Sequence, residues 1–236
     1  MRQYLTFGGH DSRTYGVYIS GQGTFNSPAR AYEMQPVPGR NGDLIGNDRR
    51  FENIEVTYPA FVYTNFRTAM ANWRNVLLSQ EGYQRLIDTY HPDEYRLATF
   101  IGPLEVEAEA NNKAGQFDLT FNCKPQRFLL SGDTVQTFTG NGSITNPTLF
   151  PAKPLIRIYG TGKVGIGSNA ITVTYAPGNY TDVDCEMMDA YYGATNCNRF
   201  VRIQNNDFPT LPAGATGITL QNGVTKVEIT PRWWRV

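Results

Sequence analysis

The sequence predicts a mainly β protein of two domains, and three observations support this prediction. Only 18% of the 236 residues are charged, whereas Tyr (14), Phe (13), Gly (23) and Pro (14) are plentiful, a composition that favours strands and turns over helices. The length fits two domains of about 100–150 residues each. A stretch rich in Gly, Thr, Asn and Ser at residues 131–146 places the boundary near Leu130, between domains of residues 1–130 and 131–236.

The N-terminal domain is expected to begin with two strands and to continue into an exposed arm. Residues 4–19 indicate a strand, a turn and a second strand. Residues 21–53 are rich in Gly, Pro, Asn and Arg, and we expect them to form the arm. Within it, Asn41-Gly42 stands between short apolar flanks, which predicts a hairpin turn.

A single helix is predicted at about residues 65–80, after a strand at residues 54–61. Asn65 is a suitable N-cap and Gly82 a suitable end signal. Six apolar residues recur at helical spacing: Phe66, Ala69, Met70, Trp73, Val76 and Leu77. One helix beside several strands is expected to pack across a sheet face, with Trp73 in the core.

Four further strands complete the N-terminal domain, which we expect to be β-sandwich-like. Turn residues separate apolar runs at 85–90, 95–101, 104–110 and 116–123, the pattern of an antiparallel meander. In the third run, Glu105, Glu107 and Glu109 share one strand face, which indicates a solvated or partner-facing edge.

The C-terminal domain contains short strands at a spacing typical of a β-sandwich. They are expected at residues 155–159, 170–175, 181–187, 199–203, 217–220 and 225–229. Asn222-Gly223 is predicted to join the last two as a hairpin.

A glycine motif in this domain resembles a nucleotide-binding fingerprint only in its spacing. Gly160, Gly162 and Gly165 fit the pattern G-x-G-x-x-G after a predicted strand. A dinucleotide site needs the third glycine to open a helix, but Gly, Asn and β-branched residues follow. We therefore interpret the motif as a glycine-rich connection between strands.

A group of acidic residues follows in the same domain. Asp182, Asp184 and Glu186 alternate along one face of a predicted strand, and Asp189 lies close behind. Such a group could bind calcium or supply the carboxylate pair of a glycosidase. Side chains at alternate strand positions project in parallel, whereas hydrolysis needs two carboxylates that face each other across the sugar. A structural role is favoured, with calcium as a minor alternative.

The remaining residues carry no signature of an enzyme, a cofactor site or a metal site. The two histidines, His10 and His91, occur without a nucleophile elbow, a zinc-protease motif or a P-loop. Three cysteines without Cys-x-x-Cys spacing indicate reduced structural thiols: Cys123, Cys185 and Cys197. Zero net charge argues against general attraction to nucleic acid, and no apolar run approaches the ~20 residues of a membrane span. We expect a soluble, non-enzymatic product of the cytoplasm.

The chain ends in an unusual aromatic motif, Pro231-Arg232-Trp233-Trp234-Arg235. Neighbouring residues of a strand face opposite ways, so one tryptophan is expected in the core and the other on the outer surface. An anchor for a partner protein is the rival interpretation.

A series of short motifs occurs in a fixed order along nearly the whole chain. The N-terminal half contains Ser12, Gly16-Val17, Pro38-Gly39-Arg40-Asn41-Gly42 and Arg50-Phe51-Glu52-Asn53-Ile54. The C-terminal half contains Asp184-Cys185-Glu186-Met187-Met188-Asp189-Ala190-Tyr191, Asn196, Asn206-Asp207-Phe208-Pro209-Thr210-Leu211 and Pro231-Arg232-Trp233-Trp234. In order and spacing, the series resembles the distal tail (Dit) proteins of siphophages.

This resemblance implies a structural virion protein at the distal tip of a long, non-contractile tail. The N-terminal domain would form a hexameric ring that continues the tail tube, and the C-terminal domain would be a galectin-like β-sandwich. The ring would be a baseplate hub for host adsorption, joining the tail tube protein to a tail-associated or tail fibre hub protein. Tape measure and receptor-binding proteins are further expected partners.

The resemblance also suggests which residues form contacts. It implies subunit-interface residues in the arm, namely Gly39, Arg40, Asn41, Gly42, Arg50 and Phe51, and partner or core anchors at Trp233 and Trp234. The alternative function is a carbohydrate-binding, lectin-like module that contacts the host surface. The compact C-terminal half leaves no room for an inserted carbohydrate-binding module, which disfavours that alternative.

Overall fold

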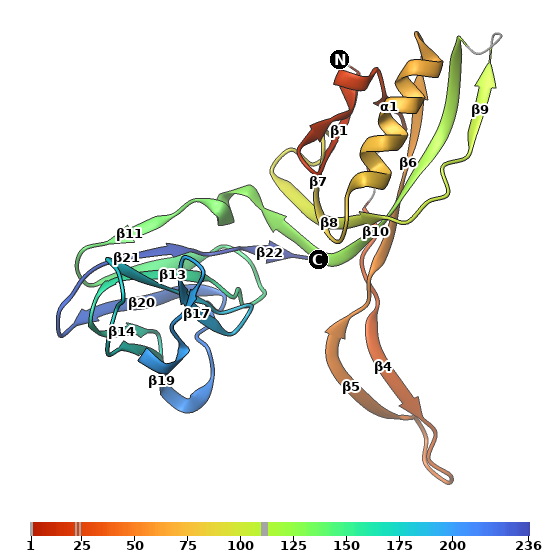
Figure 1. Cartoon of the computed structure of the whole chain (residues 1–236). Coiled ribbons are helices and arrows are strands. Elements are labelled where there is room, and N and C mark those ends of the chain that lie inside the picture. The colour runs from red at the N-terminus through yellow and green to blue at the C-terminus, as the bar shows by residue number, and fades with distance from the viewer. Residues whose placement is uncertain (1, 22, 24, 110–112) are drawn as a thin grey trace. The chain divides into compact units, whose positions relative to one another are not determined.

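The structure is a computed structural model that describes residues 2–21, 23, 25–109 and 113–236 (Figure 1). The described residues form a mainly β protein, which confirms the predicted fold class. The chain divides into two compact units: an N-terminal unit, Met1–Arg127 with Val236, and a C-terminal unit, Phe128–Arg235. The division falls inside one long strand, β10 (Ala114–Leu129). Within the described residues, no helix has the length and apolar character that a bilayer span requires.

The N-terminal unit is built on an antiparallel sheet with the strand order β2-β1-β7-β8-β10-β6-β3. Its other strands are β1 (Leu5–Phe7), β2 (His10–Asp11), β3 (Tyr18–Ile19), β6 (Ile54–Val62), β7 (Gln84–Asp88), β8 (Glu94–Phe100) and β9 (Val106–Glu109), and a 3-10 helix spans Ser12–Tyr15. The predicted meander over residues 85–123 is wrong in one respect, because β8 and β9 are not partners. Both pair with β10, whose 16 residues provide room for more than one neighbour.

The predicted helix is present as α1 (Phe66–Ser79), and it covers one face of this sheet (Figure 1). Its six predicted apolar residues are the ones it buries, and Trp73 is fully buried. Asn65 occupies the predicted N-cap position, but its backbone is left-handed (φ 52°) and its side chain makes no capping hydrogen bond. Its carbonyl oxygen instead accepts the Ala69 N–H at 3.0 Å. The helix ends three residues before Gly82.

A hairpin of β4 (Arg30–Gln35) and β5 (Leu44–Phe51) forms a separate two-stranded sheet in the N-terminal unit. Figure 1 shows it projecting from the start of β6, away from the end of the sheet where α1 begins. We call residues 30–51 the arm.

The C-terminal unit consists of two sheets around one core. The strand orders are β11-β21-β13-β16-β17-β18 and β12-β20-β14-β15-β19. The strands of these sheets are β11 (Gln136–Phe138), β12 (Gly142–Asn146), β13 (Leu155–Gly160), β14 (Gly162–Ile166), β15 (Asn169–Val173), β16 (Tyr180–Asp184), β17 (Asp189–Tyr192), β18 (Thr195–Asn196), β19 (Val201–Ile203), β20 (Gly214–Gln221) and β21 (Val224–Thr230), with 3-10 helices at Leu130–Asp133, Asn198–Phe200 and Gln204–Asn206. The last strand, β22 (Trp234–Arg235), pairs with β10 instead. Ile156, Ile158, Val183, Val227 and Ile229 are among the fully buried core residues. The unit is the predicted β-sandwich.

The glycine motif lies at a corner where a two-stranded ribbon passes from one sheet to the other. β13 pairs with β21 in the first sheet, and β14 pairs with β20 in the second. A Cβ atom at Gly160 would collide with the backbone of Gly223, and one at Gly162 with the backbone of Asn222. The motif is therefore a connection between strands, as the sequence interpretation proposed, and close backbone approach explains Gly160 and Gly162.

The hairpin predicted at Asn222-Gly223 is wrong, although the turn itself is present. Both residues adopt the positive φ angles of a tight turn, 55° and 90°. The strands that they join, β20 and β21, lie in different sheets. The turn residues are the same in a hairpin and in this corner, so the local sequence signal does not distinguish them.

Candidate assembly surfaces

The arm ends in a loop of eight residues, Pro36–Asp43, between its two strands. A tight turn within the loop is closed by the Arg40 N–H, which donates to the Val37 carbonyl at 3.2 Å. Pro38 and Gly39 occupy the centre of this turn, and Gly39 has φ 77°. The two-residue hairpin turn predicted at Asn41-Gly42 is wrong, because Pro38-Gly39 forms the turn and Gly42 only helps to return the chain.

The six predicted interface residues lie at opposite ends of the arm. Gly39, Arg40, Asn41 and Gly42 are exposed in the loop at its tip. Arg50 is exposed at the base of the arm. Phe51, also at the base, is half-buried, because the guanidinium of Arg30 on the paired strand lies over its ring, 4.5 Å from the centroid. The tip is therefore free to contact a partner, whereas Phe51 already has an intramolecular contact.

The middle of the arm carries exposed apolar side chains that the sequence analysis missed. Tyr32 is 43%, Met34 54% and Ile45 58% exposed. The sequence does contain a pattern that indicates them: Tyr32 and Met34 alternate with polar residues in one segment, and the apolar pair Leu44-Ile45 follows in the next. It was overlooked because Gly, Pro and Asn dominate the surrounding composition.

The acidic residues of the C-terminal unit are engaged by basic side chains. Asp182 accepts hydrogen bonds from Arg157 Nε and Nη2 at 2.7 and 2.9 Å. Asp184 accepts two bonds from Arg232, each 2.8 Å long. Both carboxylates are almost fully buried, so each arginine neutralises a charge that would otherwise be costly to bury.

Electrostatic shifts agree with this pairing. Burial acts most strongly on the pKa of Asp184 and raises it, but hydrogen bonds from Arg232 and from the N–H groups of Met187 and Glu186 outweigh burial, so its pKa is lowered. The hydrogen bond to Asp182 similarly raises the pKa of the Arg157 guanidinium. Asp184 is thus a structural ion that its partners keep charged.

The other two acidic residues also have local partners. Glu186 forms an exposed ion pair with Lys153 at 3.2 Å. Asp189 Oδ1 accepts the Asn198 amide at 2.6 Å and the Asn196 amide at 3.3 Å. In the part of the chain that the structure describes, no group of three potential ligands is arranged to hold a metal ion. The acidic residues here support the fold and offer no calcium cage.

The terminal tryptophans differ in the way predicted for neighbouring strand residues. Trp233 is buried in the core of the C-terminal unit. Trp234 is half-exposed, stacks on Phe150 with 4.5 Å between ring centroids, and donates Nε1–H to the Pro151 carbonyl at 3.0 Å. The motif closes the C-terminal unit: Trp233 is enclosed, and the outer part of Trp234 faces solvent.

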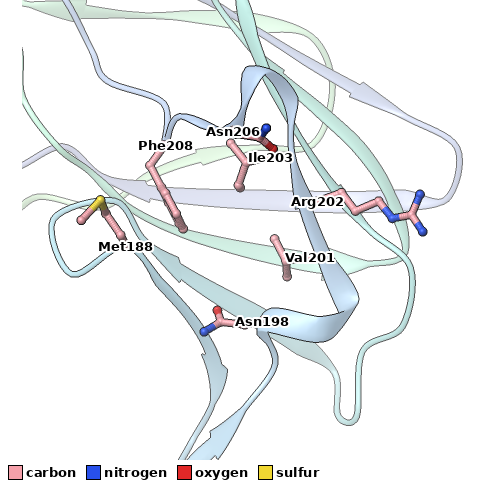
Figure 2. Close-up of a pocket in the computed structure, with 7 residues that line it drawn as sticks. All are labelled: Met188, Asn198, Val201, Arg202, Ile203, Asn206 and Phe208. Atoms are coloured by element: carbon pink, nitrogen blue, oxygen red, sulfur yellow. The ribbon is translucent and has the colours of Figure 1, made fainter.

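A hollow of about 520 Å³ lies beside the edge strand β19 of the C-terminal unit. Figure 2 shows Val201, Ile203 and Phe208 pointing into it, whereas Arg202 points the opposite way. The Asn198 amide on its rim is already bonded to Asp189 and to the Ala190 N–H. A sugar site needs several polar groups converging on one ligand, and this arrangement does not supply them.

Comparison with known proteins identifies the fold. No protein-family model and no curated protein matches the sequence. Among solved structures, the Dit protein of phage SPP1, described as a paradigm of the hub adsorption apparatus in phages that infect Gram-positive bacteria, superposes with a TM-score of 0.75 at 13% identity and covers 100% of both chains.

Baseplate structures give the same result. A chain of the phage P2 baseplate in its activated conformation with Ca matches with a TM-score of 0.53 at 11% identity, over 97% of this chain and 98% of that chain. The corresponding structure with Sr gives 0.52 at 11% identity, over 99% and 98%. The resemblance noted in the sequence is therefore confirmed at the level of the fold: along its whole length, this chain is folded like the hub protein Dit.

Proposed function

We propose that this protein is a structural hub of a phage tail tip, in which six copies form a ring at the distal end of the tail tube. The observation that carries the proposal is the match to the SPP1 Dit hub, which extends over both chains from end to end. Because the match includes both units, it covers the whole architecture of that hub protein.

The proposed ring has two kinds of partner. The N-terminal units would continue the tail tube protein, and the opposite side of the ring would hold a tail-associated or tail fibre hub protein. Tape measure and receptor-binding proteins are further candidates.

The arm is the proposed contact between neighbouring copies. It projects from the N-terminal unit as a separate two-stranded sheet with an exposed tip. A lone hairpin of two strands is only marginally stable in water, and contact with a neighbour would stabilise it.

Light scattering coupled to size-exclusion chromatography tests the proposal. The purified chain, measured over a hundredfold range of concentration, is expected to show a species of six times the 26.4 kDa chain mass. A protein that remains a monomer throughout the range would contradict the ring.

A further inference from the structure

A second hollow of the C-terminal unit differs in its lining from the one beside β19. It measures about 370 Å³ and lies between the turn from β14 to β15, the loop after the 3-10 helix Gln204–Asn206, and the start of β20. This volume falls at the lower end of the roughly 300–1,000 Å³ typical of small-molecule pockets. We call it the polar hollow, because six of the side chains that line it are polar: Ser168, Asn169, Asn205, Asp207, Thr210 and Thr216.

Thr216 is the buried member of this set. Its side chain is only 4% exposed, and its hydroxyl oxygen has no hydrogen-bond partner among the described residues. Burying an unpaired hydroxyl is unfavourable, and valine would fill the same space without that cost. An unpaired hydroxyl in the wall of a hollow therefore points to a ligand that forms hydrogen bonds.

The rim of the polar hollow offers further groups that the fold does not use. Within the described part of the chain, the side chains of Ser168, Asn205 and Asp207 form no hydrogen bond or ion pair, and all three are exposed. Asn169 instead holds the wall in place: its Nδ2 donates to the Asp207 carbonyl at 2.6 Å, and its Oδ1 accepts the Ala170 N–H at 2.8 Å. The hollow beside β19 differs, because its Asn198 amide is already bonded.

The charge of the lining narrows the class of ligand. Asp207 is the one charged side chain among the described residues that line the polar hollow, so an anionic ligand would be repelled. A single carboxylate is a poor site for a divalent cation, which prefers several oxygen ligands with more than one carboxylate. Ile166, Phe208 and Pro212 add apolar surface beside the hydroxyl and amide groups. This combination suits a neutral sugar, which presents hydroxyl groups and apolar C–H faces together.

We propose that the polar hollow binds a neutral sugar unit of a glycan, with the Thr216 hydroxyl inside the site and Ser168, Asn205 and Asp207 on its rim. The site is formed by the loops at one end of the sandwich and needs no inserted carbohydrate-binding module. It gives the chain a ligand in addition to its proposed place in the tail tip, and it does not depend on the ring.

Saturation-transfer NMR on the full chain tests for this ligand class. The neutral probes are the methyl glycosides of glucose, galactose, N-acetylglucosamine and rhamnose, and the anionic probes are glucuronic acid and glucose 6-phosphate. At least one neutral probe is expected to bind with a Kd of about 1–10 mM, and each anionic probe at least about fivefold more weakly. No transfer to any neutral probe at about 50 mM, or equal binding of an anionic one, would overturn the proposal.

Two matched valine substitutions locate the site. Thr181 also has a buried hydroxyl without a described partner, but it lies in β16 of the other sheet, so Thr181→Val is the control for Thr216→Val. Thr216→Val is expected to raise the Kd of the bound sugar at least about fivefold and Thr181→Val less than about twofold, while both variants melt no earlier than wild type. Equal effects on the Kd would overturn the assignment of the site.

A rim variant separates binding from folding. The Asp207 carboxylate is exposed and has no partner in the described chain, so Asp207→Ala should leave the melting temperature unchanged and raise the Kd at least about fivefold. Unchanged binding by Asp207→Ala would contradict the proposed rim. If rings form but no neutral sugar binds, this inference fails and the proposed function stands. If a sugar binds but no ring forms, the proposed function fails and the site stands.

Discussion

Arg232 holds Asp184 with two hydrogen bonds of 2.8 Å, and it does so from a left-handed backbone conformation with φ 60°. A non-glycine residue in this region is strained, so the surrounding contacts must stabilise it. Asp184 also accepts the N–H groups of Glu186 and Met187. One carboxylate therefore fixes both the chain terminus and the turn after β16.

Asp184→Asn is expected to lower the free energy of unfolding by about 3 kcal/mol, because it leaves Arg232 without its charged partner. Glu186→Gln is the matched control: its ion pair with Lys153 is exposed, and its loss should cost under about 1 kcal/mol. Urea unfolding followed by tryptophan fluorescence measures both. Equal losses would show that the Arg232 pair is not the stabilising contact.

The same pair predicts a pH dependence. The folded pKa of Asp184 lies below its ordinary value of 3.8, so its contribution is complete at neutral pH and is lost as the pH falls below about 4. The stability gap between wild type and Asp184→Asn should therefore shrink on acidification. A gap that is unchanged between pH 7 and pH 3 would contradict the lowered pKa.

Gly162→Ala is expected to destabilise the C-terminal unit by at least about 2 kcal/mol, since its Cβ would meet the backbone of Asn222 and Gln221. Gly217→Ala serves as the control, because a Cβ there meets no atom within 4 Å. Its effect should stay within about 1 kcal/mol. Thermal melting of the two variants compares them, and similar melting temperatures would remove the corner explanation for the glycine motif.

Two buried arginines of the N-terminal unit should respond in opposite ways to replacement by methionine. Arg127 donates to the buried Glu94 at 2.9 Å, so Arg127→Met should cost about 3 kcal/mol. Arg96 is equally buried, but no described residue accepts a hydrogen bond from its two terminal nitrogens, and burial lowers its pKa. Arg96→Met should therefore be neutral or stabilising in urea unfolding. A loss comparable to that of Arg127→Met would reveal a partner for Arg96.

The three cysteines should be inert until the protein unfolds. All three are buried and free, and burial raises the pKa of Cys123 and Cys185 to about 12. At pH 8 a thiol reagent is expected to label none of them in the native protein and all three in urea. Rapid labelling of native protein would contradict their burial.

Sequence patterns predicted those parts of the fold that are determined by one segment alone. The helical spacing from Phe66 to Leu77 identified α1 and its buried face, because a single apolar stripe is sufficient to do so. The Asn222-Gly223 turn was recognised but assigned to a hairpin, since the sheet that receives each strand depends on distant partners. The structural role of Asp182 and Asp184 likewise depends on their partners Arg157 and Arg232, which are far away in the sequence.

The candidate assembly surface was predicted only in part. Composition located the arm, because Gly, Pro and Asn are poorly suited to a core. It did not identify the exposed apolar side chains in the middle of the arm, since the pairing of Met34 with Ile45 depends on the register of β4 and β5. That register follows from the length of the loop, and the turn at Pro38-Gly39 was missed in favour of Asn41-Gly42.

Electron microscopy of the purified protein tests the hub account most directly. Class averages at micromolar concentration are predicted to show closed rings with sixfold symmetry in end view. A reconstruction should place each arm against the neighbouring subunit. Particles the size of a single 26.4 kDa chain, with no closed rings at any concentration, would contradict the central claim.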